Sequence, residues 1–297
     1  MGGNLAQYTI AEKISCTGRG VHSGALVQLT LHPARVDTGL VFRRVDCAGA
    51  RDLHLGPDLV SSTSFATRIG AGDSAIGTVE HLLAALRGLG VDNARIEVDG
   101  PEIPVMDGSA ASFVYLIRSA GIYAQKGRRR VIRIRRPIEI REGDRSIRIE
   151  PDRAFRVSYR IDYPHPVIGR QELHDLVVDP RSFEREIARA RTYGFLRDVD
   201  ALRNAGFARG ASPDNTIVLD DRRVLNPEGL RFPDEFVRHK VLDLVGDLAL
   251  LGLPVLGHVR VERGGHALHQ RLVRAIHAEC VAPAPEAPPL SVAQPAW

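Results

Sequence analysis

The sequence predicts an α+β protein built from two similar halves. Three observations support this prediction: short alternating strands in each half, amphipathic helices between them, and a weak internal repeat. The repeat relates residues 84–98, AALRGLGVDNARIEV, to residues 248–262, LALLGLPVLGHVRVE. Each segment runs from the end of a helix through Gly-Leu-x-Val into an alternating strand, which suggests a duplicated α+β unit.

The composition is that of a globular protein without a strong charge bias. The chain has 297 residues, 44% of them hydrophobic and 26% charged, and a formal net charge of +4. This small excess gives no reason to expect a nucleic-acid partner. The 3 cysteines are far apart and form no Cys-x-x-Cys pair. Any metal would therefore be held by histidine and carboxylate ligands, and a reducing compartment is expected.

Targeting and membrane-spanning signals are missing from the sequence. Residues 1–15 lack the continuous apolar core of a signal peptide. The longest apolar run, residues 248–256, contains Gly252 and Pro254 and is far shorter than the ~20 residues of a spanning helix. We therefore expect a cytoplasmic protein with no transmembrane segment.

The first half alternates strands with helices. A helix is predicted over residues 79–86, where valine and leucine recur at helical spacing, with Thr78 as its N-cap. A second helix is expected over residues 109–120 and ends at Gly121. Short β-rich segments bounded by Gly, Pro or Asp predict strands over residues 25–31, 39–42 and 94–98.

The basic segment 126–136, KGRRRVIRIRR, marks the start of the second half. A phosphate or nucleic-acid patch is one interpretation, but isoleucines alternate with charged residues from Ile132 to Ile149. This alternation favours the solvated face of a sheet that begins a second domain. The predicted division is 1–125, 126–281 and a disordered Pro-rich tail, 282–297. Further strands are expected over residues 155–161 and 258–262, and helices over 183–190 and 233–251.

The segment 235–252, EFVRHKVLDLVGDLALLG, is the most informative helix. At ~100° per residue, His239, Asp243 and Asp247 lie within roughly 80° of one another. Valine and leucine on the opposite side form a buried stripe. An exposed polar face is the simpler interpretation of this column. However, the column lacks the scattered Lys and Glu of a solvated face, and Gly246 leaves room there for something to approach.

Glu80 and His81 form a second group near a helix start. A metal held by His81, His239 and Asp243 would have three protein ligands and an open position for water, as in catalytic zinc sites. Glu80 could then accept a proton from that water. Two histidines and one carboxylate are also typical of non-haem iron oxygenases, so these residues alone leave the metal and the reaction open.

Two glycine-rich segments carry further histidines. His266 follows Gly264-Gly265, so it is either an accessible acid oriented by Asp247 or a loop histidine without a role. The other segment is residues 17–24, TGRGVHSG. It predicts a phosphate cradle only weakly, because it lacks the Lys-Ser/Thr ending of a P-loop.

Six motifs, in this order along the chain, closely resemble those of the bacterial UDP-3-O-acyl-N-acetylglucosamine deacetylase family of lipid A synthesis. They extend over residues from about 7 to 278. The resemblance implies two α+β domains of similar topology packed face to face, with helices between the sheets and the site in the seam. It also implies zinc-dependent removal of acetate from an acylated UDP-glucosamine. The motifs are GVHSG, TVEHLLAALRGLGVDN, PEIPVMDGSA, RARTYGFLRD, LRFPDEFVRHKVLDLVGDL and GGHAL.

By motif match, the resemblance assigns roles to residues of this chain. His81, His239 and Asp243 would bind one zinc ion, with Fe²⁺ able to substitute. Glu80 would be the general base. His266, held by Asp247, would protonate the leaving amine or stabilise the oxyanion. The full set implied for catalysis is Glu80, His266, Asp247 and Thr192, with Thr192 donating a hydrogen bond to the oxyanion.

The resemblance also implies contacts to the substrate. Lys240 would bind phosphates or sugar, and Arg263 would contact phosphate. His22 would lie near the acyl chain or sugar, and Tyr163 would stack on the uracil. A β-α-β insert near residues 191–224 would bind the fatty chain through lining residues Phe195, Leu202, Phe207 and Ile217. Tyr193 stands where the family commonly has Phe. We expect a monomer close to the membrane surface, with no nucleic-acid partner.

Overall fold

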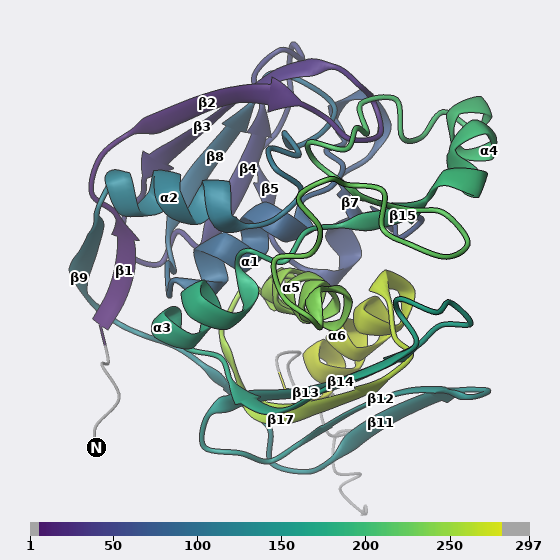
Figure 1. Cartoon of the computed structure of the whole chain (residues 1–297). Coiled ribbons are helices and arrows are strands. Elements are labelled where there is room, and N and C mark those ends of the chain that lie inside the picture. The colour runs from purple at the N-terminus through teal and green to yellow at the C-terminus, as the bar shows by residue number, and fades with distance from the viewer. Residues whose placement is uncertain (1–5, 281–297) are drawn as a thin grey trace, which may run out of the picture.

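The computed structural model describes residues 6–280 (Figure 1). Its architecture is α+β, as predicted. Two mixed sheets form the outer layers, and four main helices lie between them. These helices are α1 (Glu80–Gly88), α2 (Ala111–Ser119), α5 (Glu235–Leu248) and α6 (His266–Cys280).

The two sheets have the same topology. The first sheet has the order β2-β3-β8-β4-β5 and the second has β11-β12-β17-β13-β14, with β10 also pairing with β17. The first contains β2 (Ile14–Arg19), β3 (Leu26–Pro33), β8 (Ala94–Val98), β4 (Leu40–Arg44) and β5 (Leu53–His54). The second contains β11 (Ile138–Glu142), β12 (Arg145–Glu150), β17 (Val255–Glu262), β13 (Phe155–Asp162), β14 (Arg170–Val177) and β10 (Ile132–Arg133).

The central strands β8 and β17 show the duplication most clearly. Each pairs antiparallel with one neighbour, β3 or β12, and parallel with the other, β4 or β13. Each follows one inner helix, α1 or α5, and precedes the other, α2 or α6. The weak repeat in the sequence therefore coincides with the segments α1–β8 and α5–β17, and the predicted duplication is confirmed.

Alternating burial explains why each sheet needs a helical cover. In β3, Val27, Leu29 and Leu31 are buried against the helices. In the second half, Ile132, Ile134, Ile138, Ile147 and Ile149 are buried and Ile140 is half-buried, whereas Arg133, Arg135 and Arg136 are exposed. The basic segment is thus a solvated sheet face, as its alternation predicted.

Smaller elements connect and extend this frame. Strand β1 (Ala6–Ile10) pairs with β9 (Ile122–Arg128), and β6 (Val60–Ser62) pairs with β7 (Arg68–Ile69). Within the segment predicted as an insert, β15 (Tyr193–Phe195) and β16 (Ile217–Leu219) are parallel, and α4 (Val199–Asn204) lies between them in the chain. Short 3₁₀ helices span Pro57–Leu59, Gly72–Ser74, Leu196–Asp198 and Ala249–Leu251.

The predicted domain boundary at residue 125 falls within β9, and this division stays a prediction. The predicted disordered tail, 282–297, lies outside the described residues. Among residues 6–280, no helix has both the length and the apolar character needed to cross a membrane.

One local prediction was wrong, and another was correct only in part. Thr78 does not cap α1, because the helix begins at Glu80 and the Thr78 hydroxyl instead donates to the buried carboxylate of Glu102 at 2.7 Å. Residues 183–190 do not form a regular α-helix. They continue the short helix α3 (Pro180–Ser182) as a π-helical turn over Phe183–Ile187.

The polar column of α5 packs against α1 and is not exposed to solvent. The reason is Gly246: a Cβ atom there would lie 2.0 Å from the carbonyl oxygen of Glu80. Only glycine allows α5 to approach the first turn of α1 this closely. The contact places Glu80 and His81 beside His239 and Asp243 in the seam between the two sheets.

Candidate active site

His81 comes from the first turn of α1, and His239 and Asp243 lie one turn apart on α5. Nε2 of His239 is 3.4 Å from Oδ1 of Asp243, and Nε2 of His81 is 3.7 Å from the same oxygen. One ligand atom of each residue lies within 4.8 Å of the others. Ligands bound 2.0–2.2 Å from a tetrahedral zinc ion lie about 3.3–3.6 Å apart. The spacing therefore fits a shared metal ion.

The protonation states of these three residues also suit a metal. Burial lowers the pKa of His81 to about 3 and lowers the pKa of His239, so both imidazoles are neutral. Burial opposes ionisation of Asp243, but the nearby His239 and Lys240 hold its pKa well below the usual value. The set thus offers two nitrogen lone pairs and one carboxylate, which are the forms that bind metals.

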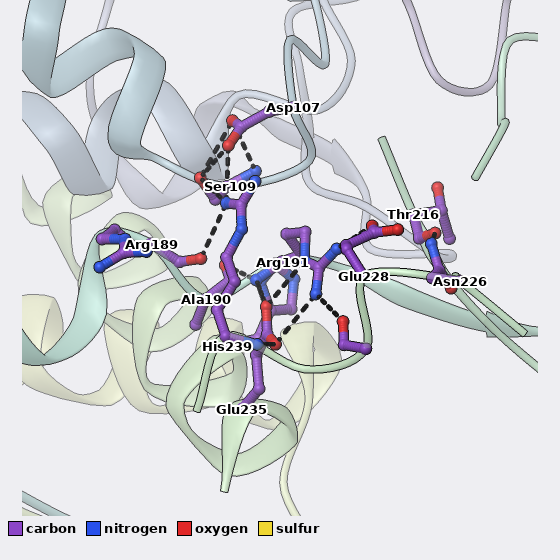
Figure 2. A network of polar contacts seen from close by, with 12 residues as sticks. Asp107, Ser109, Arg189, Ala190, Arg191, Thr216, Asn226, Glu228, Glu235 and His239 are labelled. Carbon is purple, nitrogen blue, oxygen red and sulfur yellow. Dashed lines mark hydrogen bonds and ion pairs between the residues drawn. The ribbon is translucent and has the colours of Figure 1, made fainter. Parts of the chain in front are cut away.

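A hydrogen bond behind the site fixes the His239 ring. It lies beside a polar network around Arg191 (Figure 2). Nδ1 of His239 donates to the carbonyl oxygen of Ala190 at 3.0 Å, which leaves the Nε2 lone pair facing Asp243. Next to Ala190, the buried Arg191 donates through Nε to Glu235 Oε1 at 2.9 Å and through Nη1 to Glu228 at 2.7 Å. Glu235 is fully buried and lies one turn before His239 on α5. The ion pair therefore holds the Ala190 carbonyl in place.

The same network reaches the PEIPVMDGSA motif. Nη1 of Arg231 donates to Asp107 at 2.7 Å and to the carbonyl oxygen of Arg189 at 3.0 Å. Burial opposes ionisation of Asp107, but Arg231 holds its pKa below the usual value. The amide of Thr192 donates to the Gly108 carbonyl at 2.8 Å. These contacts fix the segment that carries the Thr192 side chain to the site.

Glu80 and His266 lie beside the three candidate ligands. Nε2 of His266 is 3.9 Å from Oε1 of Glu80 and 4.0 Å from Oδ2 of Asp243. Burial raises the pKa of Glu80 to about 8. Burial alone would lower the pKa of His266, but the charge and hydrogen bond of Asp247 raise it to about 9. A carboxyl group with a pKa near neutrality thus faces an imidazole that is protonated at neutral pH.

Asp247 orients two histidines. Its Oδ2 accepts hydrogen bonds from Nδ1 of His266 at 2.7 Å and from Nδ1 of His269 at 2.8 Å. Nε2 of His269 accepts from the buried Tyr159 hydroxyl at 3.0 Å. Burial opposes ionisation of Asp247, but its histidine partners hold its pKa at about 2. Hydrogen bonds thus join Asp247 to both His266 and His269. The three residues form a support behind the site and not a second metal site.

Three neighbouring cavities surround these groups. The middle cavity, about 240 Å³, is lined by the candidate ligands, Glu80, His266 and Thr192. A polar cavity of about 530 Å³ shares Tyr163, Lys240 and His266 with it. A mainly apolar cavity of about 350 Å³ shares Phe65, Glu80, His81, Thr192 and Tyr193 with the middle one. The site therefore joins a polar compartment to an apolar one.

The polar cavity contains three of the predicted substrate-binding residues. Nζ of Lys240 is 2.7 Å from Oδ2 of Asp243 and also lines the middle cavity. The guanidinium of Arg263 pairs with Asp144 and Asp162 at the cavity wall. The hydroxyl of Tyr193 donates to the Tyr163 hydroxyl at 3.0 Å, and both side chains line the middle cavity.

The apolar cavity contains only part of the predicted acyl lining. Phe195, Leu202 and His22 line it. Phe207 packs edge-on against the His22 ring at 5.3 Å between centroids. Ile217 is fully buried in the core, because its strand β16 turns this side chain inward. The prediction of Ile217 as a lining residue is thus wrong. The prediction of Phe207 stays a prediction, because its ring also packs against Phe65, which lines the cavity.

Sequence reasoning missed the supporting residues Arg191, Glu235, Glu102 and His269. Glu102 accepts hydrogen bonds from the backbone amides of His22 and Ser23 at 3.0 and 2.8 Å, which hold the GVHSG loop. Glu235 carries a signal that could have been used, since it precedes His239 by the same i,i+4 spacing that joins His239 to Asp243. Contacts between residues far apart in the chain, such as that of Glu102 with His22, leave no such spacing pattern in the sequence.

The duplicated fold and its buried two-histidine, one-aspartate set define an α+β metal-binding enzyme with the site between its two halves. The model of the family described as LpxC: UDP-3-O-acyl N-acetylglycosamine deacetylase matches residues 7–278. The chain belongs to this family.

Relatives carry the same family name. The UDP-3-O-acyl-N-acetylglucosamine deacetylase of Nitratidesulfovibrio vulgaris is 53% identical over 92% of this chain and 88% of that protein. The deacetylase of the same name from Anaeromyxobacter sp. (strain Fw109-5) is 51% identical, over 92% of this chain and 89% of its own length. The one from Thioalkalivibrio sulfidiphilus is 45% identical over 98% of both chains.

Proposed function

We propose that this chain hydrolyses the acetamide of UDP-3-O-acyl-N-acetylglucosamine to UDP-3-O-acyl-glucosamine and acetate, the committed step of lipid A biosynthesis. The single observation that carries the chemistry is the position of Glu80 and His266. Oε1 of Glu80 and Nε2 of His266 face each other 3.9 Å apart, and both residues line the cavity of the candidate ligands. A base and an acid on the same cavity suit amide hydrolysis better than oxygenation.

The metal of this proposal is one catalytic Zn²⁺ ion, with Fe²⁺ able to substitute. His81, His239 and Asp243 would hold it, since their donor atoms and spacing fit a three-ligand site. When bound, zinc acidifies a water molecule and polarises the amide carbonyl.

The protein's own residues then move the protons. Glu80 would accept a proton from the attacking water, a role that suits a carboxyl group whose pKa burial raises to about 8. The hydroxyl of Thr192, which lines the same cavity, would donate to the oxyanion of the tetrahedral intermediate. Nε2 of His266 would donate its proton to the leaving nitrogen, because Asp247 holds the opposite nitrogen, Nδ1, at 2.7 Å.

The three cavities suit the three parts of this substrate. The polar cavity, with Lys240, Arg263 and Tyr163, would take the uridine diphosphate. The middle cavity would take the acetamide. The apolar cavity, with Phe195 and His22 in its wall, would take the fatty chain.

We further propose that the enzyme acts as a cytoplasmic monomer close to the membrane surface. The free thiols of Cys16, Cys47 and Cys280 support a reducing compartment. Phe65 and Leu196, which line the apolar cavity, are 62% and 52% exposed and would suit a nearby lipid surface. Cell fractionation and light scattering of the purified protein test these points.

The decisive experiment is acetate release from purified protein and UDP-3-O-acyl-N-acetylglucosamine. We expect stoichiometric acetate and deacetylated product by mass spectrometry. Chelation should abolish the reaction, and one equivalent of zinc should restore it. Absence of product with the zinc-loaded protein would overturn the proposed function, and restoration by Fe²⁺ alone would overturn the choice of metal.

A further inference from the structure

Thr67 lies between the two carboxylates that the proposed mechanism uses. Its hydroxyl Oγ1 donates to Oδ1 of Asp247 at 2.6 Å, and its backbone amide donates to Oε2 of Glu80 at 3.1 Å. The residue is 1% exposed. One residue therefore contacts both the proposed base and the carboxylate that holds the proposed acid.

The hydrogen bonds around Asp247 show why this hydroxyl matters. Nδ1 of His266 and Nδ1 of His269 both donate to Oδ2. Among residues 6–280, Thr67 supplies the one hydrogen bond to Oδ1. An ionised carboxylate only accepts, so the single proton of the hydroxyl is directed to Asp247. Without it, both remaining donors hold the same oxygen, and the carboxylate can rotate about its Cβ–Cγ bond.

The hydroxyl oxygen also faces His266. Oγ1 of Thr67 is 3.3 Å from Nδ1 of His266. Because the hydroxyl proton already points at Asp247, this contact is favourable only when Nδ1 carries a proton. That arrangement leaves Nε2 of His266, which faces Glu80, as the nitrogen that exchanges a proton with substrate.

The backbone of Thr67 is held within the first half of the molecule, whereas Asp247 lies in the second half. Its carbonyl oxygen accepts from the amide of Val79 at 3.3 Å, just before α1 begins. Its amide holds the Glu80 side chain at that same helix start. Its hydroxyl reaches α5, which belongs to the second half. Thr67 thus sets the position of the Asp247–His266 pair relative to Glu80 across the seam.

We propose that Thr67 is a positioning residue of this enzyme, whose hydroxyl fixes the Asp247 carboxylate, and through it His266, relative to Glu80. The inference rests on the proposed deacetylation. It assigns Thr67 no contact with substrate or metal.

The test compares Thr67→Val, which keeps the shape and removes the hydroxyl, with Thr67→Ser, which keeps the hydroxyl. Partners behind a site's functional groups typically contribute 10–100-fold to activity. We therefore expect kcat of Thr67→Val to fall about 10-fold or more. KM and zinc content should stay unchanged, because neither the ligands nor the cavity walls are altered. Thr67→Ser should recover most of kcat.

Thr30→Val is the matched control. It removes a buried threonine hydroxyl that contacts Ser15 at 3.0 Å in the outer sheet, away from the site. Its kcat should equal that of the unaltered protein. If Thr67→Val fails to fold by circular dichroism, Thr67→Ala takes its place in every comparison.

A second measurement needs no substrate. In the zinc-loaded protein, hydrogen-bonded imidazole N–H protons give separate proton NMR signals, assigned with His266→Ala and His269→Ala. Thr67→Val should shift or broaden the His266 Nδ1–H signal, whereas Thr67→Ser and Thr30→Val should leave it in place. If the unaltered protein releases no acetate, the proposed function fails, yet this signal still tests the contact.

Two results would overturn the inference. One is a Thr67→Val protein with unaltered kcat or an unaltered His266 signal. The other is a Thr67→Ser protein as impaired as Thr67→Val, which would show that the residue matters for packing and not for its hydroxyl.

Discussion

Helices α1 and α5 occupy equivalent places in the two halves, but they carry different chemistry. Helix α1 has 9 residues and supplies Glu80 and His81 from its first turn. Helix α5 has 14 residues and supplies His239, Asp243 and Asp247 along successive turns. The difference teaches that the duplication provided the scaffold but not a symmetric site. Neither half holds the complete set of candidate metal ligands.

The two candidate histidine ligands show the same asymmetry. Nδ1 of His239 is fixed by the Ala190 carbonyl and, behind it, by the Arg191–Glu235 pair (Figure 2). Nδ1 of His81 is buried without a hydrogen-bond partner among residues 6–280. A hydrogen bond to the protein therefore orients the ligand of the second half, whereas Nδ1 of the first half's ligand has no such bond to residues 6–280.

Removing one ligand from each half gives the largest expected effect. His81→Ala and His239→Ala should each lose the bound metal and with it several kcal/mol of transition-state stabilisation, which corresponds to roughly 10³-fold or more in kcat. Metal analysis and acetate release measure both effects. A variant that loses one histidine yet keeps stoichiometric zinc and full turnover would show that this residue is not a ligand.

Glu80→Ala tests whether the first half supplies the base. The variant should keep its zinc, because Glu80 is not among the ligands, while kcat falls by about 10²–10⁴-fold. Metal content and turnover are measured on the same preparation. Full activity would contradict the assignment of Glu80 as base, and loss of zinc would indicate a role in binding the metal.

The pH profile tests the acid supplied by the second half. Glu80 must be ionised to act, so activity should rise with pH through its pKa, which is about 8 without metal. A bound cation lowers that value and moves the rising limb below pH 8. His266 must be protonated, so activity should fall as pH rises through its pKa, which is about 9 without metal and is also lowered by a bound cation. His266→Ala should lower kcat by roughly 10²-fold and lose the falling limb. An unchanged limb would assign it to another group.

Glu235→Gln tests the support behind His239 and should give the smallest effect on turnover. Outer-shell partners typically contribute about 10–100-fold to metal affinity, measured by competition with a chelator. Breaking a buried ion pair should also cost about 3 kcal/mol of unfolding free energy, measured by urea titration. Glu184→Gln, in the exposed pair with Arg118, is the control and should cost less than about 1 kcal/mol. Equal losses in both variants would contradict a special role for the buried pair.

Local sequence patterns predicted the fold and most of the residues at the site. The repeat anticipated the shared strand order, and the alternating isoleucines anticipated a sheet face at the basic segment. The i,i+4 column on α5 placed His239, Asp243 and Asp247 together, because a helix fixes the geometry of residues one turn apart. The glycine-rich segment had already marked His266 as a candidate acid, and the family resemblance then favoured that role and added Thr192; both roles stay predictions.

The failures occurred where distant segments compete for the same group. Thr78 fits a helix cap by composition, but the Glu102 carboxylate takes its hydroxyl. Ile217 fits an acyl lining by residue type, but its side chain is fully buried in the core. A residue's type states which contacts it can make, and the surrounding fold decides which it does make.

The sequence by itself determined the donor types, their helical spacing and the duplicated frame, since each depends on neighbours within a few residues. Only the tertiary structure decided that α1 and α5 meet at Gly246, that Glu80 faces His266, and that Thr67 joins the two halves. Those arrangements depend on contacts between segments far apart in the chain. Their geometry is set by the close packing of the seam and by the need of every buried polar group for a partner.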